Sequence, residues 1–518
     1  MKVSVSVKSK LKKLWGSMHD NLHSNQMKEI DEHIEFIKEV YDFWPIAYYP
    51  FGMSKNHNGF SLEDLLDEKI IENDWEIIRK KTIEQNNLGY PMFMGYEWQG
   101  SGEDGDHNLF FVDNDYNMYH PHRYNNLKDY YEVGKFIAIP HHIAYKLGNR
   151  GKNWSTHDEA ISPFAEIFSS HGSSETDFTE MPMARHIHMG PRVENTSYKS
   201  GLLKGIKIGC ICSGDNHKFS GQYENGNMCV LARDNSKEAI WEGLINGRVY
   251  GLSKGRMDID CYLDNHIIGS TVKASSNSNL EVSVIGDYAI DRIEVLKDEV
   301  LEYAYYNSGK WENKVLPKEF KMKTKIEFGW GPDIRIFKDL TSKKWDVTLK
   351  TTGKILDVEK NWNSFGQKII SQDDKELRCE LTTRKSTDSG KWMASSDVKN
   401  EAFTLELFGS LEDELRVYVF GNEYVYKYKE LLTGSVIEND EEAVKKLLMD
   451  RYSLSSFYRN DSWWHNSYKF KIYQAVPEEA YTCKFNRKIS TIGAKSIRIK
   501  VFQKNGAVAF VSPVFIEG

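Results

Sequence analysis

Residues 206–217, IKIGCICSGDNH, show the pattern that decides the fold of this chain. An apolar run typical of a buried β-strand ends in Ser-Gly, and an aspartate and a histidine follow. The same pattern occurs in residues 93–97 (FMGYE), 136–142 (FIAIPHH) and 164–171 (FAEIFSSH). In parallel α/β folds the carboxyl ends of the strands converge on one rim, so residues distant in sequence meet there. The sequence therefore predicts a rim of carboxylates and imidazoles that is able to hold metal.

The distribution of histidine supports this interpretation. Fourteen of the sixteen histidines lie at or before His217, which leaves only His266 and His465 in the rest of the chain. Histidine is the commonest metal ligand and also transfers protons. Surface or packing histidines would be spread more evenly, so the chemistry is expected in the N-terminal half.

Two further segments are expected to reach the same rim. His19 follows the first apolar segment, and His107 lies in the segment Gly105 to Asn108, which precedes the strand-like residues 109–112. A carboxylate such as Glu97 can bridge two cations while imidazoles complete each shell. Such a centre polarises a phosphoryl or carbonyl oxygen and lowers the pKa of bound water, so hydrolysis is the leading chemistry.

Length and charge limit the possible functions. At 518 residues the chain exceeds the size of one hydrophobic core, so two or three domains are expected. A net charge of −7 and a pI near 6.2 argue against general affinity for nucleic acid. No apolar run is long enough to span a membrane, and the N-terminus has no ordinary export signal. Six cysteines without a disulfide framework fit a soluble protein of the reducing cytoplasm.

Helical patterns fill the gaps between the strand-like runs. Residues 27–44 carry apolar side chains three or four apart, which predicts one buried helix face. Ser61 is expected to cap a second helix, with a further helical stretch over residues 75–83. Another helix is expected to start at residues 235–236 and end at Asn246-Gly247. Strands alternating with helices predict a largely parallel sheet or barrel.

The pattern changes after residue 255. Apolar and polar residues alternate in several segments, which is typical of half-buried strands. Asn505-Gly506 predicts a tight hairpin, and residues 440–449 predict one helix among the strands. We therefore expect residues 1–255 to form a metal-binding α/β domain and residues 256–518 to form a mainly antiparallel β-sandwich region.

Six segments in this order resemble the motif series of the PHP (polymerase and histidinol phosphatase) superfamily. They are Gly16 to His19, Gly95 to Trp98, Gly105 to Asn108, Ile139 to His142, Glu166 to Gly172 and Ser213 to His217. The chain is most similar to a poorly characterised branch that carries a C-terminal β-domain. The resemblance covers roughly residues 10–255, and the final strands near residues 498–515 are similar as well.

This resemblance implies a distorted (β/α)7 barrel, which is TIM-like, holding divalent zinc, manganese or iron and hydrolysing phosphoesters. Glu97 would bridge the metals, and His142 can align in place of His141. The metal ligands carried over by motif are His19, Glu97, His141 or His142, His171, Asp215 and His217.

Departures from the family pattern limit the number of metals. The family opens with Asp-Leu-His-x-His, whereas Ser17 and Asn21 stand at the outer positions here. Asn is a poor zinc ligand, so either His23 reaches in or that metal binds weakly. The family's Thr-Asp-His is replaced around residues 47–50 by AYYP, which has no ligand. One or two metals per chain are therefore expected.

Three residues are candidates for catalysis. The metals and Arg192 would stabilise developing negative charge, and either His217 or His107 would protonate the leaving group. His107 equally suits support of a metal ligand or simple packing, and Arg192 equally suits an ordinary solvated loop.

Three functions remain open. The first is hydrolysis of a phosphoester, and the second is metal-assisted cleavage of a carbohydrate derivative. The third is an inactive barrel whose β-domain binds a glycan or a partner. The expected substrate is a small molecule or a carbohydrate; neither nucleic acid nor membrane is expected as a partner.

Overall fold

The structure is a computed structural model whose chain falls into two compact units. It describes residues 11–55, 61–118, 126–130, 134–181, 190–334, 336–385, 400–453 and 461–518. The second unit comprises Ile285–Ile290 and Asn307–Cys483, and the first unit contains the remainder. Every metal-ligand candidate belongs to the first unit.

A six-stranded sheet begins the first unit. Its strands are, in spatial order, β2 (Asn21–His23), β4 (Ala47–Tyr49), β7 (Met92–Trp98), β8 (His107–Phe111) and β9 (Phe136–Pro140), with β3 (Trp44–Pro45) also paired to β7. β2, β4 and β7 run parallel, whereas β8 is antiparallel to both of its neighbours. The short connection between β7 and β8 forces this direction, because only antiparallel strands can be joined by a tight loop.

A three-stranded sheet continues from β9. It contains β11 (Gly172–Ser173), β10 (Phe164–Ser169) and β12 (Gly209–Cys212), of which β10 and β12 are parallel. The Ala138 amide of β9 donates to the Ile161 carbonyl at 2.8 Å, just before β10. After β12, Asn216 forms a parallel bridge with Asp20, which returns the chain to the start of β2. The ligand-bearing segments therefore meet at one place.

One hydrophobic cluster lies beneath these strands. It includes Phe93 of β7, Phe110 of β8, Ile137 of β9, Phe164 of β10 and Ile211 of β12. The shared core explains how strands of two sheets hold one site together, because burying large apolar side chains is the main stabilising term in folding.

The unit is mixed α/β with many strands and few helices. The predicted (β/α)7 barrel is not shown, because the described strands form separate open sheets and the β7–β8 hairpin replaces a strand-helix-strand crossover. Within the described ranges of this unit, the α-helices are α1 (Ile30–Val40), α2 (Glu68–Asn87), α3 (Tyr198–Leu203) and α4 (Lys237–Ile245). Short 3-10 turns accompany them at η1 (Ser24–Glu29), η2 (Leu127–Tyr130) and η4 (Glu194–Thr196).

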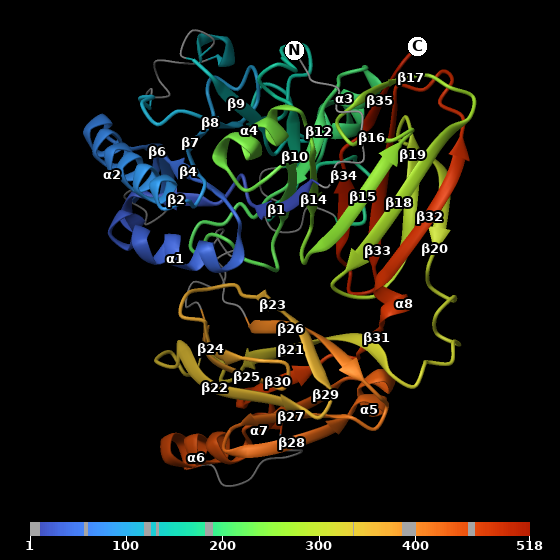
Figure 1. Cartoon of the computed structure of the whole chain (residues 1–518). Helices are drawn as coiled ribbons and strands as arrows, with labels where there is room; N and C mark the ends of the chain where they lie inside the picture. The colour runs from blue at the N-terminus through green and yellow to red at the C-terminus, as the bar shows by residue number, and fades with distance from the viewer. Residues whose placement is uncertain are drawn as a thin grey trace. The chain divides into compact units, whose positions relative to one another are not determined.

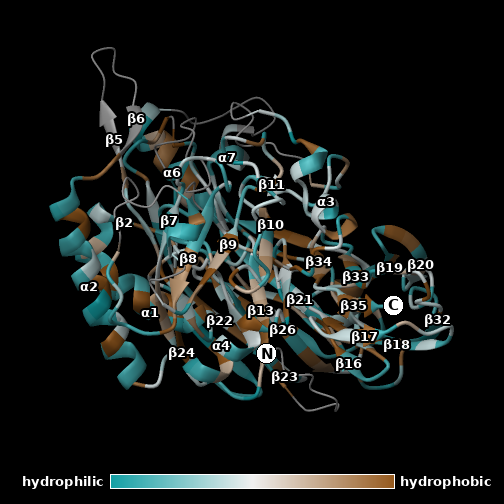
Figure 2. Cartoon of the chain, turned by 90° about the horizontal axis from the view of Figure 1, so that it is seen from above, coloured by the Kyte–Doolittle hydropathy of each residue, from teal (hydrophilic) through white to brown (hydrophobic). Residues whose placement is uncertain are grey.

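The predicted helices have mixed outcomes. The amphipathic pattern of residues 27–44 forms η1 and α1 only as far as Val40, since Tyr41 is extended and Trp44 begins β3. Ser236 caps α4 by accepting from the Ala239 amide at 3.3 Å. The predicted helix start at Ser61 is wrong, since Ser61 begins strand β6 (Ser61–Leu65), paired to β5 (Phe51–Lys55). α2 starts at Glu68 instead, where the Asp67 carboxylate accepts from the Lys69 amide at 3.0 Å. Figure 2 shows hydrophilic and hydrophobic residues on both α1 and α2, as expected for helices that cover a core.

The last strands of the chain belong to the first unit. Its nine-stranded sheet has the order β1 (Lys12–Gly16), β13 (Asn227–Ala232), β14 (Val249–Leu252), β34 (Val508–Val511), β33 (Ser496–Gln503), β19 (Ile290–Lys297) and β20 (Val300–Tyr306), with β17 (Thr271–Lys273) and β35 (Val514–Glu517) alongside. Figure 1 shows the red β33 and β34 beside the green strands. The hairpin at Asn505-Gly506 is confirmed, and Gly506 has the positive φ of 83° that this turn requires.

The predicted division at residue 255 therefore differs from the compact units. A four-stranded sheet of β16 (His266–Ile267), β15 (Met257–Leu263), β18 (Ser278–Gly286) and β32 (Thr482–Ile489) lies beyond that residue. Phe502, Phe510 and Phe515 share a core cluster with Ala165 and Ile167 of β10. Long-range strand pairing and this shared core join both ends of the chain in one unit.

The second unit is mainly antiparallel β, as predicted. One sheet has the order β23 (Lys354–Asn361), β26 (Glu401–Gly409), β21 (Phe320–Trp330), β30 (Tyr468–Ile472) and β29 (Val436–Asn439), with β31 (Val476–Pro477) on β21. The other has the order β24 (Lys368–Gln372), β25 (Glu376–Arg384), β22 (Ser342–Thr351), β27 (Glu414–Val419) and β28 (Asn422–Lys427). Phe328 of the first sheet packs on Trp345 of the second with ring centroids 5.6 Å apart, as in a sandwich core.

Short helices complete the second unit. They are α5 (Tyr428–Thr433), α6 (Glu441–Tyr452), α7 (Asp461–Asn466) and α8 (Glu478–Tyr481). α6 confirms the helix predicted over residues 440–449, and the Asp440 side chain caps it.

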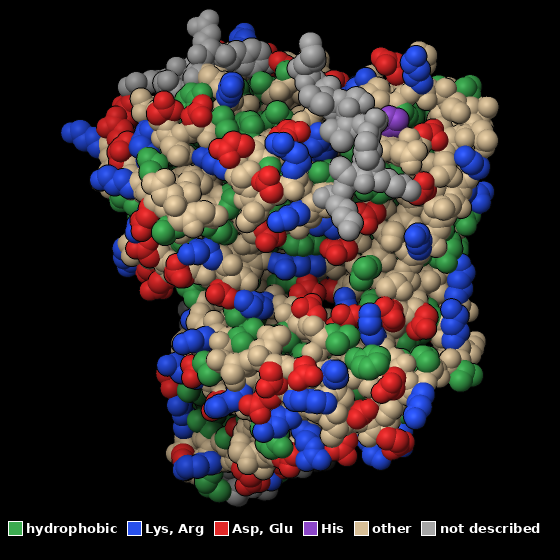
Figure 3. Space-filling model, in the orientation of Figure 1, with side chains coloured by type: hydrophobic (Ala, Val, Ile, Leu, Met, Phe, Trp, Pro, Cys, Tyr) green, Lys and Arg blue, Asp and Glu red, His purple; other side chains and the backbone are tan. Residues whose placement is uncertain are grey.

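Three further observations concern the surface, the cysteines and the helices. On the face drawn in Figure 3, acidic and basic side chains are interspersed. All six cysteines are buried and free. Among the described residues, no helix combines the length and apolar character needed to cross a membrane.

Candidate metal centre

The structure gathers every predicted metal ligand into one cluster, in which all members except the partly exposed His217 are buried. The backbone delivers them from segments at the ends of β1, β7, β9, β10 and β12. They are His19 between β1 and β2, Glu97 in β7, His141 and His142 after β9, His171 after β10, and Asp215 and His217 after β12.

His19 lies among three carboxylates. Its Nδ1 is 2.8 Å from Glu166 Oε2, and its Nε2 is 3.4 Å from Glu97 Oε2 and 3.3 Å from Asp215 Oδ1. The side chain is fully buried. The Glu166 contact fixes the orientation of the ring and leaves Nε2 directed at the other two carboxylates.

Asp215 joins the second half of the cluster. His171 Nε2 lies 3.0 Å from Asp215 Oδ2, and His217 Nε2 lies 3.3 Å from Oδ1. His142 Nε2 is 3.9 Å from Oδ2. Asp215 and His142 both have positive φ, 51° and 54°, which is uncommon for residues other than glycine and is concentrated at functional sites.

His141 and His142 have the environment of metal ligands. Neither ring nitrogen of His141 has a hydrogen-bond partner in the described part of the chain, and the same holds for His142 Nδ1. His141 Nε2 is 3.6 Å from Glu97 Oε1. An unsatisfied buried polar atom is costly, and a cation held by these nitrogens would remove that cost.

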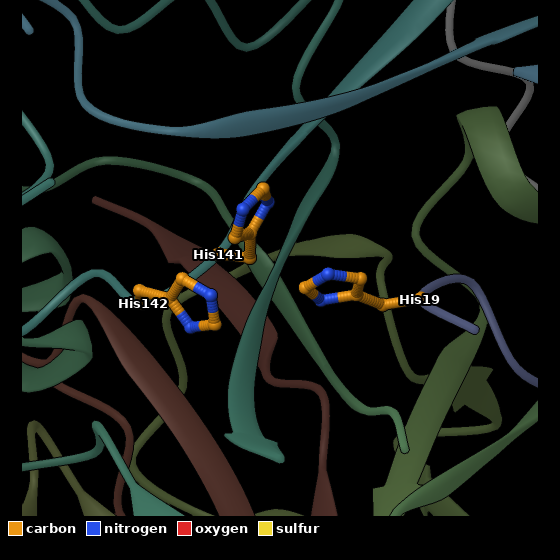
Figure 4. Close-up of side chains that lie close together, drawn as sticks. All are labelled: His19, His141 and His142. Atoms are coloured by element: carbon orange, nitrogen blue, oxygen red, sulfur yellow. The ribbon is translucent and has the colours of Figure 1, made fainter. Parts of the chain in front are cut away.

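The ligand atoms are close enough to share cations. One group comprises His19, His141 and His142, and the other comprises His142, His171 and Asp215; within each, the ligand atoms lie within 4.8 Å of one another. Figure 4 shows the imidazoles of His19 and His142 pointing toward each other, with His141 above the space between them. His142 therefore belongs to both groups.

The electrostatics favour a cation. Burial would raise the pKa of Glu97, but His141 and His19 hold it well below its usual range. Burial likewise opposes ionisation of Asp215, yet the surrounding histidines keep its pKa well below the ordinary value. Burial, helped by neighbouring histidines, lowers the pKa of His142 and favours the neutral imidazole that binds metal.

Two supporting residues were not predicted from the sequence. The Glu166 carboxylate holds His19, and the Tyr145 hydroxyl is 2.7 Å from His171 Nδ1. Such contacts to the second nitrogen of a metal-binding histidine orient the ring. The acidic residue inside the apolar run of residues 164–168 was the available signal for Glu166; Tyr145 had none.

His23 does not take the place of Asn21 beside Asp215. The Asn21 amide donates to Asp215 Oδ1 at 3.1 Å. His23 Nε2 is 2.9 Å from His217 Nδ1, whereas the opposite nitrogen of His217 faces Asp215. His23 therefore lies behind His217 and supports it.

The predicted catalytic residues other than His217 lie outside this cluster. His107 Nδ1 is 2.9 Å from the Gly105 carbonyl, and its Nε2 is 3.2 Å from Lys152 Nζ. Both nitrogens thus have partners within the protein. The Arg192 guanidinium donates to the carbonyls of Ser173 and, at 3.4 Å, Met181. The catalytic roles of His107 and Arg192 stay predictions.

Comparison with known proteins identifies no family. No protein-family model and no curated protein matches the chain. Among solved structures, one similar chain is a two-domain protein from Bacteroides vulgatus that contains a predicted PHP-like metal-dependent phosphoesterase. It is 13% identical, with 57% of this chain and 83% of that chain covered and a TM-score of 0.33. A major pilin subunit of Bacillus cereus is 9% identical, with 52% and 67% covered and a TM-score of 0.08. These likenesses are too low to assign a function.

Proposed function

We propose that this protein is a metal-dependent hydrolase with a one- or two-metal centre that acts on a phosphoester. The observation that carries this proposal is the convergence of His19, His141, His142, His171 and Asp215, whose buried ligand atoms form two groups that share His142. Within that cluster both ring nitrogens of His141 are buried without hydrogen-bond partners among the described residues.

The donor set suits zinc, manganese or iron. His19, His141 and His142 would hold one ion, and His171 and Asp215 would hold a second with His142 or alone. Imidazole and carboxylate ligands are typical of these metals. Because His142 is common to both groups, the centre accommodates either one ion at a time or two ions of which only one uses His142.

The surrounding residues prepare this centre for chemistry. A bound divalent ion would polarise a substrate oxygen and lower the pKa of a water molecule. Glu166 and Tyr145 hold His19 and His171 in place, and burial excludes competing bulk water. His217 is partly exposed and borders Asp215, which suits proton transfer when it does not bind metal.

The preference for a phosphoester rests on the motif resemblance and is an argument by analogy. The same resemblance supports our proposal that the strands around the cluster derive from a distorted (β/α)7 barrel. We also propose a cytoplasmic location, which the six buried free cysteines support, and a small-molecule substrate.

Metal analysis of purified protein tests the centre. We expect about one or two equivalents of transition metal in the wild type and a marked loss in Asp215→Ala. The matched control is Asp258→Ala, since Asp258 is exposed on β15. Less than about half an equivalent in the wild type, unchanged in Asp215→Ala, would indicate a binding protein without a metal centre.

Activity assays divide the two enzymatic alternatives. Phosphomonoesters, phosphodiesters and aryl glycosides are tested with added manganese or zinc. Hydrolysis of a phosphoester that is lost in Asp215→Ala supports the proposal. Hydrolysis of a glycoside alone would replace it with carbohydrate cleavage.

A further inference from the structure

One polar side chain on the inner face of β8 has no role in the centre described above. Asn108 is directly opposite Glu97 of β7 in one antiparallel pair and opposite Ile139 of β9 in the other. Residues directly opposed in antiparallel strands place their side chains on the same face of the sheet. Asn108 therefore shares a face with Glu97, which His141 also reaches, because its Nε2 is 3.6 Å from Glu97 Oε1.

Asn108 lies at the border between this polar group and the core. Phe110, two residues further along β8 and therefore on the same face, belongs to the hydrophobic cluster beneath the ligands together with Ile139 and Met18. The Asn108 side chain is completely buried. An amide in such a place is costly unless its polar atoms have partners.

A hydrogen bond orients the amide group of Asn108. Its Nδ2 donates to the carbonyl of Met18, the residue before His19, at 3.4 Å. Turning the amide by half a rotation would place Oδ1 against that carbonyl oxygen, so the contact assigns Nδ2 to Met18 and directs Oδ1 elsewhere. The same bond ties β8 to the segment that carries His19.

The Oδ1 atom of Asn108 is a buried acceptor without a donor. In the part of the chain that the structure describes, no hydrogen-bond partner reaches it. Glu97 stands opposite and is an acceptor itself, because its carboxylate is ionised beside His19 and His141. Two oxygen acceptors on one face, next to unpaired imidazole nitrogens of His141, suit a cation.

An amide oxygen adds a different chemistry to an imidazole site. Carbonyl and carboxylate oxygens are the preferred ligands of hard ions such as manganese, whereas imidazole suits zinc and iron. The group of His19, His141 and His142 contributes nitrogen donors alone. Oxygen from Asn108, with Glu97 nearby, makes this donor set more favourable to manganese.

We propose that Asn108 Oδ1 is a further ligand of the cation held by His19, His141 and His142, and that it shifts the preference of this site from zinc toward manganese. This inference rests on the proposed function and extends it to the identity of the metal.

The test is calorimetric titration of metal-stripped full-length protein with manganese and, separately, with zinc. Asn108→Leu removes the oxygen at similar size. It should weaken manganese binding about tenfold or more, because losing even a group that only orients a ligand costs about 10- to 100-fold. Zinc binding should weaken by less than about threefold, since imidazoles dominate its affinity. Asn108→Asp keeps an oxygen at this position and should bind manganese at least as tightly as the wild type.

The matched control makes the same replacement in the other unit. Asn361 is a buried strand asparagine of β23 in the second unit, so Asn361→Leu should leave both metal affinities unchanged. In metal-free protein, hydrogen exchange of peptides from β8 should be no faster in Asn108→Leu than in the wild type, because the variant removes an acceptor that has no partner.

The outcomes separate this inference from the proposed function. Unchanged manganese affinity in Asn108→Leu, or losses of equal size for both metals, overturns the ligand role and leaves the proposed function standing. Failure of the wild type to bind either metal overturns both. If Asn108→Leu does not fold, Asn108→Asp decides: manganese affinity equal to or above that of the wild type supports the ligand, and lower affinity overturns it.

Discussion

Arg498→Met is expected to destabilise the first unit strongly. Arg498 is on β33, and its guanidinium pairs with Glu175, which follows β11, and with Glu299, between β19 and β20. All three side chains are almost completely buried, with exposed fractions of 1%, 4% and 3%. The variant leaves two buried carboxylates. Among the described residues, Glu175 alone of the two then retains a cation, Lys500 at 2.8 Å.

The expected magnitude follows from this burial. Removing one partner of a buried ion pair costs about 3–5 kcal/mol, because the remaining charge is uncompensated. An exposed pair is worth about 0–1 kcal/mol, so Arg233→Met, which breaks the surface pair with Glu242, is the matched control. The loss should extend to the segment around Glu175, four residues after His171, and lower metal affinity as well.

Hydrogen exchange measured on peptides under increasing urea provides the assay. Two units can unfold separately, so a single transition for the whole chain is not assumed. Peptides from β33 report the first unit alone. A free energy of unfolding within about 1 kcal/mol of the Arg233→Met value would refute the argument, since it would mean that the buried charges are not coupled.

Three further outcomes follow from the same structure. Arg498 and Lys500 overcome the effect of burial and lower the pKa of Glu175 below its ordinary value of 4.5. The ionised Glu175 therefore stabilises the folded state at pH values above its ordinary pKa of 4.5, and this stabilisation is lost as the pH falls through the folded-state pKa. In urea titrations, the difference in free energy of unfolding between wild type and Glu175→Gln should therefore become smaller on acidification. Glu166→Gln should weaken metal binding about 10- to 100-fold in competition with a chelator, because His19 loses the carboxylate that orients it; unchanged affinity would contradict that role. Gly151→Ala should destabilise the segment after His142, because the added Cβ would lie 1.9 Å from the Tyr145 carbonyl oxygen. The expected result is faster hydrogen exchange in that segment, and an unchanged exchange rate would contradict the prediction.

Local sequence patterns predicted much of the candidate site. Glu97, His171 and Asp215 were identified because each follows or ends an apolar run, and the carboxyl end of a strand is a place where side chains gather. The structure brings these residues together. The helix start at Ser61 was predicted wrongly because a capping residue is a short-range signal, and pairing between β5 and β6 competes with it.

Other features depend on contacts between distant residues. The hydrogen bond from Tyr145 to His171 joins two segments whose packing has no local signature in sequence. The same is true of β34, which pairs with β14, and of β33, which pairs with β34; both belong to the first unit and not to the second. Alternating apolar residues predict that a strand exists but carry no information about its partner.

The amino-acid sequence by itself determined which side chains are available for metal chemistry and that each is at the end of a buried strand, because hydrophobic periodicity and strand ends are local properties. Only the tertiary structure decided that His142 belongs to both ligand groups, that Tyr145 contacts His171, and that residues 484–518 complete the first unit. The physical reason is that these features arise from packing and charge pairing between residues far apart in the chain. The interaction energy of such residues depends on how close the fold brings them and not on their separation in sequence.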